Sequence, residues 1–113
     1  MNIVAIVQAR MGSSRMPGKV LQKIIDTPMI EILFDRLSHS KKINKIILAT
    51  TTNHNDDLLV RYIKQINYDV FRGSEIDVLD RYFRAAEKEN ADVIVRITGD
   101  CPLVDSDLVD QLI

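Results

Sequence analysis

A segment near the start of the chain, residues 8–19, combines positive charge with small residues that let the backbone bend. Its cations are Arg10, Arg15 and Lys19, and its small residues are Gly12, Ser13, Ser14 and Gly18. Small residues allow backbone N–H groups to approach an anion closely, and the cations would neutralise its charge. We therefore predict that this segment binds phosphate groups, in preference to the alternative of a surface loop with scattered charges.

The spacing of its glycines separates this segment from two common phosphate motifs. In the Walker A motif four residues stand between the glycines and Ser or Thr follows the lysine. Here five residues separate Gly12 from Gly18, and Val20 follows Lys19. The Rossmann dinucleotide motif needs a third glycine, which the segment lacks. The sequence thus predicts a phosphate site that is neither a P-loop nor a dinucleotide site.

A second candidate for chemistry is Asp100, which follows an apolar run within Thr-Gly-Asp-Cys-Pro. A carboxylate on a tight turn can hold a hard cation through oxygen, or it can cap its own turn. A phosphate site on an adjacent strand favours the metal role, because a nucleoside triphosphate brings Mg²⁺, which takes one or two protein carboxylates. The nearby pair Asp105 and Asp107 is interpreted as the start of a helix.

The elements that would position these residues alternate between strands and helices. Apolar runs rich in Val and Ile predict buried strands at residues 3–7, 45–49, 68–71 and 92–97. Pro28 and Asn55 are predicted to begin the first two intervening helices, a third is predicted over residues 76–89, and a fourth from about Ser106. The predicted inward stripes are Ile30, Leu33, Phe34 and Leu37; Leu59, Tyr62, Ile63 and Ile66; and Leu79, Tyr82, Phe83 and Ala86.

This βαβ alternation predicts a largely parallel sheet covered by helices on its faces. In open α/β sheets ligands bind outside the carboxyl ends of the strands. The four strand ends lead into residues 10–19, 50–55, 72–77 and 98–105, which carry most of the side chains suited to polar chemistry. We therefore expect one functional edge of the sheet.

Composition excludes several classes of protein. The chain of 113 residues is 46% hydrophobic, as expected of one globular domain, and its net charge of -1 gives no general attraction to nucleic acid or to an anionic membrane. It contains no apolar run of the length that spans a membrane and no signal peptide pattern. A single cysteine, Cys101, fits a reducing compartment. A cytoplasmic protein is expected.

Four segments together resemble one enzyme family, the cytidylyltransferases that activate acidic sugars such as acylneuraminate and 3-deoxy-manno-octulosonate. The resemblance is strongest to the branch of spore-coat polysaccharide biosynthesis. The matching segments are residues 8–21 (QARMGSSRMPGKVL), 49–52 (ATTT), 71–74 (FRGS) with 77–81 (DVLDR), and 96–103 (RITGDCPL). The first and last agree with the family in residue type, spacing and order.

This resemblance implies a three-layer αβα fold of the nucleotide-diphosphosugar-transferase type (GT-A, Rossmann-like), in which the first and fourth strands lie side by side. It also implies the roles of individual residues. The backbone of Gly12, Ser13 and Ser14 with Arg15 and Lys19 would hold a triphosphate, Ala9, Arg10 and Thr50 would border cytosine, Asp100 would hold Mg²⁺, and Arg72, Asp77 and Arg81 would face the sugar.

The implied reaction joins CTP to a sugar, in particular an acidic sugar, giving a CMP-sugar and pyrophosphate. Arg15, Lys19 and Asp100 would be the catalytic residues, and Mg²⁺ the cofactor. Since family members are longer, the resemblance implies that residues 1–113 form the N-terminal, nucleotide-binding part of a single cytidylyltransferase domain, truncated and inactive alone. The full-length protein is expected to be a homodimer.

Two other classes of function remain open on sequence alone. A non-catalytic nucleotide-binding module would have the same phosphate segment. A glycosyltransferase using a preformed nucleotide sugar could be built on the same scaffold, and an Asp-x-Asp pair would be expected of it.

Overall fold

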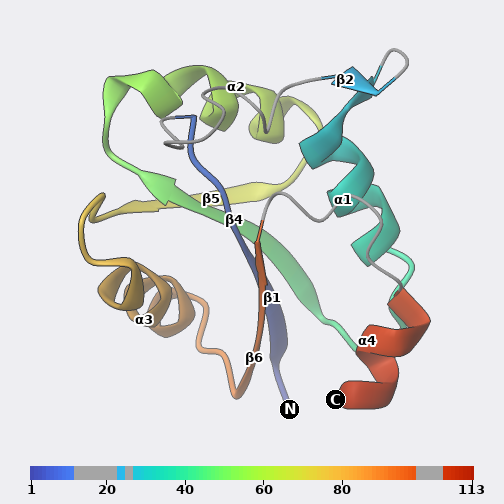
Figure 1. Cartoon of the computed structure of the whole chain (residues 1–113). Helices are drawn as coiled ribbons and strands as arrows, with labels where there is room; N and C mark the ends of the chain where they lie inside the picture. Colours follow the sequence, from blue (N-terminus) through green and yellow to red (C-terminus); the bar gives the residue numbers. More distant parts are fainter. Residues whose placement is uncertain (12–22, 25–26, 99–105) are drawn as a thin grey trace.

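The computed structural model describes residues 1–11, 23–24, 27–98 and 106–113 (Figure 1). Strands and helices alternate through most of the chain. The strands are β1 (Ile3–Gln8), β2 (Lys23–Ile24), β3 (Thr27–Pro28), β4 (Lys45–Thr51), β5 (Asp69–Gly73) and β6 (Val93–Thr98). The helices are α1 (Met29–Leu37), the 3₁₀ turn η2 (His54–Asp56), α2 (Asp57–Gln65), α3 (Val78–Lys88) and α4 (Ser106–Leu112). Each predicted strand and helix is present, with ends shifted by one or two residues.

Four strands form one parallel sheet in the order β5-β4-β1-β6. β1 lies in the middle, paired with β4 on one side and with β6 on the other, as Figure 1 shows. Five residues of β1, from Ile3 to Val7, are buried, which explains why this strand is an unbroken apolar run. The predicted parallel sheet is confirmed, and so is the expected pairing of the first and last of the four predicted strands.

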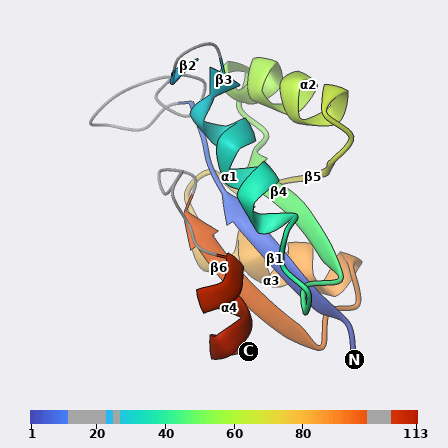
Figure 2. The ribbon, with the colours of Figure 1, turned by 90° about the vertical axis from the view of Figure 1, so that its right-hand side faces the viewer.

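Helices cover both faces of the sheet, so the architecture has three layers (Figure 2). On one face α1 and α2 pack over Val7, Leu48 and Ile97. On the other face α3 packs over alternate residues of β1 and β4, among them Ile6 and Ile47. Because consecutive strand residues point to opposite faces, both sets of side chains are buried. The predicted α/β class is confirmed.

Helix α1 follows the predicted pattern closely. Pro28 precedes its first turn, where a missing N–H costs nothing. Its predicted inward residues are all buried: Ile30, Leu33, Phe34 and Leu37. The ring of Phe34 meets that of Tyr68 edge to face at 4.7 Å between centroids, which links α1 to the chain entering β5.

The start of α2 differs from the prediction. Asn53, not Asn55, is the capping residue: its side chain accepts a hydrogen bond from the Asn55 N–H at 2.8 Å and begins η2. The α-helix itself then begins at Asp57. Leu59 and Ile63 are buried as predicted, whereas Tyr62 lies at the margin of the core, where its hydroxyl donates to the carboxylate of Glu31 on α1.

Replacing Tyr62 by Phe should remove one component of alkaline unfolding. The bond to Glu31, and then burial, raise the pKa of Tyr62 from 10.0 to about 12. Because the folded protein keeps this proton to a higher pH, the stability that the bond contributes is complete below about pH 10 and is lost as the pH rises through about 12. Urea unfolding at several alkaline pH values should show a steeper loss of stability in the parent chain than in Tyr62→Phe. The variant Glu31→Gln should bring the pKa of Tyr62 back toward its ordinary value, and identical pH profiles in all three proteins would contradict the assignment.

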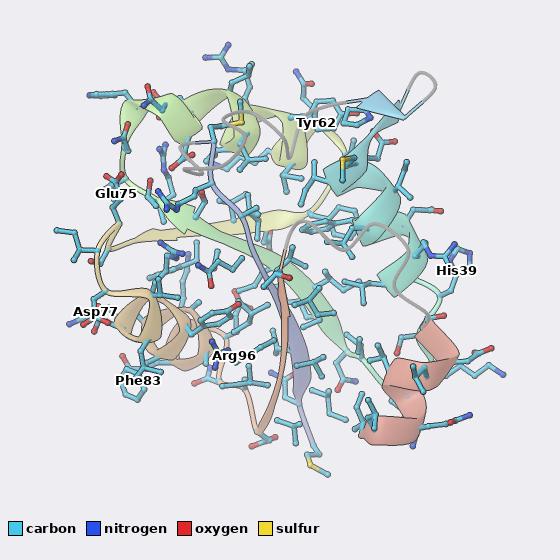
Figure 3. The ribbon with its side chains drawn as sticks, viewed as in Figure 1. His39, Tyr62, Glu75, Asp77, Phe83 and Arg96 are labelled. Carbon is cyan, nitrogen blue, oxygen red and sulfur yellow. The ribbon has the colours of Figure 1, made fainter. Side chains whose placement is uncertain are left out.

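Helix α3 is turned differently from the prediction. Its buried residues are Arg81, Tyr82, Ala85 and Ala86, while Leu79 and Phe83 are 72% and 63% exposed. Figure 3 shows Phe83 below α3, farther from the sheet than Arg96. The guanidinium of Arg96 on β6 lies over the Tyr82 ring at 4.4 Å from its centroid. The predicted stripe was therefore wrong at Leu79 and Phe83, because the helix turns Arg81 toward the sheet.

Helix α4 begins at Ser106 as predicted and lies beside β6 (Figure 2). Its Asp110 accepts hydrogen bonds from the Ser40 hydroxyl and the Lys41 N–H, in the loop after α1. Both bonds lower the pKa of Asp110, and the bond from Ser40 has the larger effect. Within the described ranges, none of the helices has the length and apolar character needed to cross a bilayer.

Candidate functional site

The carboxyl ends of β1 and β6 lie next to each other. Gln8 is in register with Thr98 across the parallel pair. The chain therefore leaves β1 and β6 at neighbouring points of the sheet. Those predicted site residues that lie outside the described part of the chain are Gly12, Ser13, Ser14, Arg15, Lys19 and Asp100.

The chain leaving β1 is held to its neighbours before it enters this segment. Ala9 is 5% exposed, and its N–H donates to the Ala49 carbonyl at 3.3 Å. Two residues later the Met11 N–H donates to a carboxylate oxygen of Asp56 at 2.6 Å. Arg10 lies between them and is half-buried. The structure thus places Ala9 and Arg10 at the functional edge, beside the end of β4.

Thr50, predicted to border the base, is fully buried near the end of β4. Its hydroxyl oxygen has no hydrogen-bond partner among the described residues. A buried hydroxyl without a partner loses the hydrogen bonds it would make to water.

Arg72, at the end of β5, braces the loop that follows β4. Its Nε donates to the Thr51 carbonyl at 2.7 Å and its Nη2 to the Asn53 carbonyl at 2.8 Å. Its Nη1 lies 2.8 Å from a carboxylate oxygen of Asp57, and this pairing lowers the pKa of Asp57. Each of its three guanidinium nitrogens therefore has a partner within the protein. Its predicted contact with a sugar stays a prediction.

Arg81 is fully buried, which is unusual for a cation. Its Nη1 donates to the Ser74 carbonyl at 2.8 Å, while Nε and Nη2 have no hydrogen-bond partner in the described part of the chain. Burial lowers the pKa of Arg81. The fit is close: a Cβ added to Gly73 would lie 3.2 Å from Arg81 Cγ and 2.9 Å from Phe71 Cε1. Glycine at position 73 therefore makes room for the arginine.

The third residue predicted on the sugar side, Asp77, caps α3. Its carboxylate accepts from the Asp80 N–H at 2.9 Å, and its own N–H donates to the Ser74 hydroxyl at 3.0 Å. Asp77 is exposed, and Figure 3 shows it at the start of the helix, apart from Arg96. A capping role accounts for these contacts.

The incomplete pairing of Arg81 gives a sharp expectation for its replacement by methionine, which has a similar length. Losing the bond to Ser74 costs about 1 kcal/mol, and removing a poorly paired buried charge offsets that loss. The free energy of unfolding of Arg81→Met should thus change by no more than about 1 kcal/mol. Urea denaturation measures it, with Phe34→Ala as a control that removes a fully buried ring. A loss of several kcal/mol in Arg81→Met would instead show that the guanidinium holds the fold together.

Sequence reasoning missed one buried acid at this edge, Asp56. It is 2% exposed and accepts hydrogen bonds from the Met11 N–H and the Thr51 hydroxyl. Asp56 directly follows Asn55, where a helix was predicted to begin, and no role at the site was predicted for it. The signal that could have found it is its place in the loop after β4, at the carboxyl edge of the sheet.

Among the predicted site residues in the described part of this edge, cations outnumber carboxylates. Three predicted site residues there are arginines: Arg10, Arg72 and Arg81. No group of three His, Cys, Asp or Glu side chains that could hold a metal occurs within residues 1–11, 23–24, 27–98 and 106–113. Such an edge suits an anionic ligand.

Comparison with solved structures defines the class of fold. A cytidylyltransferase from Leptospira borgpetersenii superposes with a TM-score of 0.93 and 41% identity, over 98% of this chain and 47% of that one. A CMP:2-keto-3-deoxy-manno-octonic acid synthetase complexed with CTP superposes with a TM-score of 0.87 and 26% identity, over 99% and 46%. The protein therefore has the nucleotidyltransferase-like α/β fold.

The family follows from sequence comparison. A family model described as cytidylyltransferase matches residues 4–113, and the chain belongs to this family. The spore coat polysaccharide biosynthesis protein SpsF of Bacillus subtilis is 40% identical over 116 residues, which are 99% of this chain and 48% of that protein. The chain thus spans about half the length of the curated relatives it matches.

Proposed function

We propose that this chain is the nucleotide-binding part of an enzyme that transfers the CMP group of CTP to a sugar, in particular an acidic sugar. The observation that carries the proposal is the register of Gln8 with Thr98. The phosphate segment follows β1 and Asp100 follows β6, and these two strands end side by side. Membership of the cytidylyltransferase family supports CTP as the nucleotide.

In the proposed reaction a sugar hydroxyl oxygen attacks the α-phosphorus of CTP. The bond from the α-phosphorus to the oxygen bridging to the β-phosphorus breaks, pyrophosphate leaves, and the hydroxyl proton passes to solvent. Arg15, Lys19 and the backbone of residues 12–14 would hold the triphosphate in line for attack. Catalysis of this kind consists of positioning and charge neutralisation.

Mg²⁺ fits the donors that the sequence offers. Asp100 supplies carboxylate oxygen, the ligand type that Mg²⁺ prefers, and phosphate oxygens would complete the coordination. The ion would neutralise charge that develops on the phosphates. Ala9, Arg10 and Thr50 would border the cytosine. The burial of Ala9 and Thr50 and the unpartnered Thr50 hydroxyl support a closely fitted contact there.

The sugar side, the pathway and the assembly are inferred from the relatives. Arg72, Asp77 and Arg81 would face the sugar, and the incompletely paired guanidinium of Arg81 suits an acidic group. Similarity to SpsF supports a role in surface or spore-coat polysaccharide biosynthesis. A homodimer of the complete enzyme and a cytoplasmic location stay predictions.

Calorimetric titration of the chain with CTP in the presence of Mg²⁺ tests the proposal. We expect binding of CTP to be tighter than that of CMP, because the phosphate segment would contact the β- and γ-phosphates. ATP serves as the control for base selection. Equal affinity for CTP and ATP, or no binding of either, would contradict the proposed function.

A further inference from the structure

The carboxylate of Asp56 joins three parts of the chain at the functional edge. Asp56 belongs to η2, after β4, and is 2% exposed. One of its oxygens accepts the Met11 N–H at 2.6 Å, and the other accepts the Thr51 hydroxyl. A buried ionised carboxylate makes stronger hydrogen bonds than a neutral acceptor does. Both oxygens of this buried group are therefore used to hold the backbone after β1 and the end of β4.

Met11 is the last described residue before the segment of Gly12 to Lys19. Its backbone is fixed by Asp56, and two residues earlier the Ala9 N–H is fixed by the Ala49 carbonyl. The Met11 side chain also packs against the core under α1 and α2. The position of the backbone from Ala9 to Met11 is thus set by β4 and by Asp56.

The residues that hold Asp56 are themselves fixed by hydrogen bonds. The Thr51 hydroxyl that donates to Asp56 also accepts the Asn53 N–H at 3.1 Å. Arg72 holds the carbonyls of the same two residues, Thr51 and Asn53. The position of the carboxylate is therefore determined by a chain of hydrogen bonds that begins on β5.

Charge gives a second reason for an acid at this position. Burial lowers the pKa of Arg81, and attraction to Asp56 partly opposes this effect. Asp56 thus supplies negative charge that acts on a buried cation. A buried cation is held more favourably when an opposite charge lies near.

We propose that Asp56 is a positioning residue for the nucleotide: by holding the Met11 amide it fixes the backbone from which the chain continues into residues 12–19, and so raises the affinity for the triphosphate. This inference rests on the proposed function. It concerns the phosphates rather than the base, because the residues that follow Met11 are the ones assigned to the phosphates.

The experiment compares Asp56→Ala and Asp56→Asn with the matched controls Asp69→Ala and Asp69→Asn. Asp69 pairs with Lys45 at 2.8 Å at the start of β5, far from the functional edge. Two quantities are measured in the whole chain: hydrogen exchange of the Met11 amide, and the affinities for CTP and CMP with Mg²⁺.

In Asp56→Ala the Met11 amide should exchange at least about tenfold faster, and the ratio of CTP to CMP affinity should fall by about tenfold, the size expected for losing a hydrogen bond to a charged group. Asp56→Asn should show a smaller change, since its carbonyl can still accept from Met11. The Asp69 variants should keep both quantities. A general loss of stability would weaken both nucleotides equally and leave the ratio unchanged.

The outcomes that overturn the inference are distinct. A folded Asp56→Ala with unchanged Met11 exchange would show that the carboxylate does not hold the backbone at Met11. Faster Met11 exchange with an unchanged ratio of CTP to CMP affinity would show that fixing the Met11 backbone does not affect binding of the phosphates. Failure of the unsubstituted chain to bind CTP would instead overturn the proposed function, and it is seen before any substitution is made.

Discussion

In the complete enzyme that we propose, replacing Asp100 by Asn should lower kcat at least about 10²-fold. Asparagine keeps the size of the side chain and much of its hydrogen bonding, so the fold and sugar binding should be nearly unchanged. It removes the negative charge that would hold Mg²⁺ beside the α-phosphate. Raising the Mg²⁺ concentration should restore part of the rate if weaker metal binding is the main defect. The rate is measured as pyrophosphate release from CTP.

The matched control for this experiment is Asp35→Asn, which removes the same charge from the exposed face of α1, away from the carboxyl edge. Circular dichroism verifies that both variants are folded. A folded Asp100→Asn enzyme with near-normal turnover would mean that Asp100 only caps its own turn. A nucleotide-binding module without catalysis would then be the better account of the protein.

Replacing Lys19 or Arg15 by Ala should each weaken CTP binding by roughly 1.5–3 kcal/mol, the value of a well-formed hydrogen bond to a charged group. This corresponds to a loss of about 10- to 150-fold in affinity. CMP should lose much less, because it lacks the β- and γ-phosphates that these cations would contact. Calorimetric titration with both nucleotides gives the two affinities.

Lys64→Ala and Arg61→Ala are the matched controls, since both residues are exposed on α2 and Lys64 stands in its last turn. They remove the same charges from exposed positions of a helix to which no phosphate contact is assigned. If Lys19→Ala weakened CMP and CTP by the same factor, the cation would not act on the β- and γ-phosphates, and the assignment of a triphosphate site would fail.

The sheet and its helices could be predicted because burial on two faces leaves a strong mark on a sequence. The run from Ile3 to Val7 is apolar throughout since helices cover it on both sides. The stripe of α1 was also predicted correctly, because Ile30, Leu33, Phe34 and Leu37 are its buried residues. In these elements local pattern and tertiary packing agree.

The buried face of helix α3 could not be predicted in the same way, because some apolar residues of this helix are exposed and a charged one is buried. Leu79 and Phe83 stand at helical spacing with Tyr82, yet they face outward, while the cation Arg81 faces inward. What decides its orientation is the space beside Gly73 and the carbonyl of Ser74. Contacts of this kind depend on the assembled fold and leave no periodic signal.

The sequence predicted at which edge of the sheet the candidate site lies, but not the hydrogen bonds that connect its residues. The types of residue at the strand ends predicted that the site lies at the carboxyl edge of the sheet, which stays a prediction, and Gln8 and Thr98 at that edge are neighbours. The hydrogen bonds of Arg72 with Thr51 and Asn53, and of Asp56 with Met11, join residues from different elements. A single sequence contains no measure of such distances.

The central place of β1 also has a consequence for the order in which the protein is made and folds. β1 is synthesised before β6, with which it pairs, and Asn2 bonds to Asp92, which lies 90 positions later. Contacts of such long range slow folding, because a large loop must close before they form. Until β6 has been synthesised, β1 has only β4 beside it and one edge of an apolar strand stays open to other chains. We therefore expect refolding to be slower than in a helical protein of equal size and more sensitive to protein concentration.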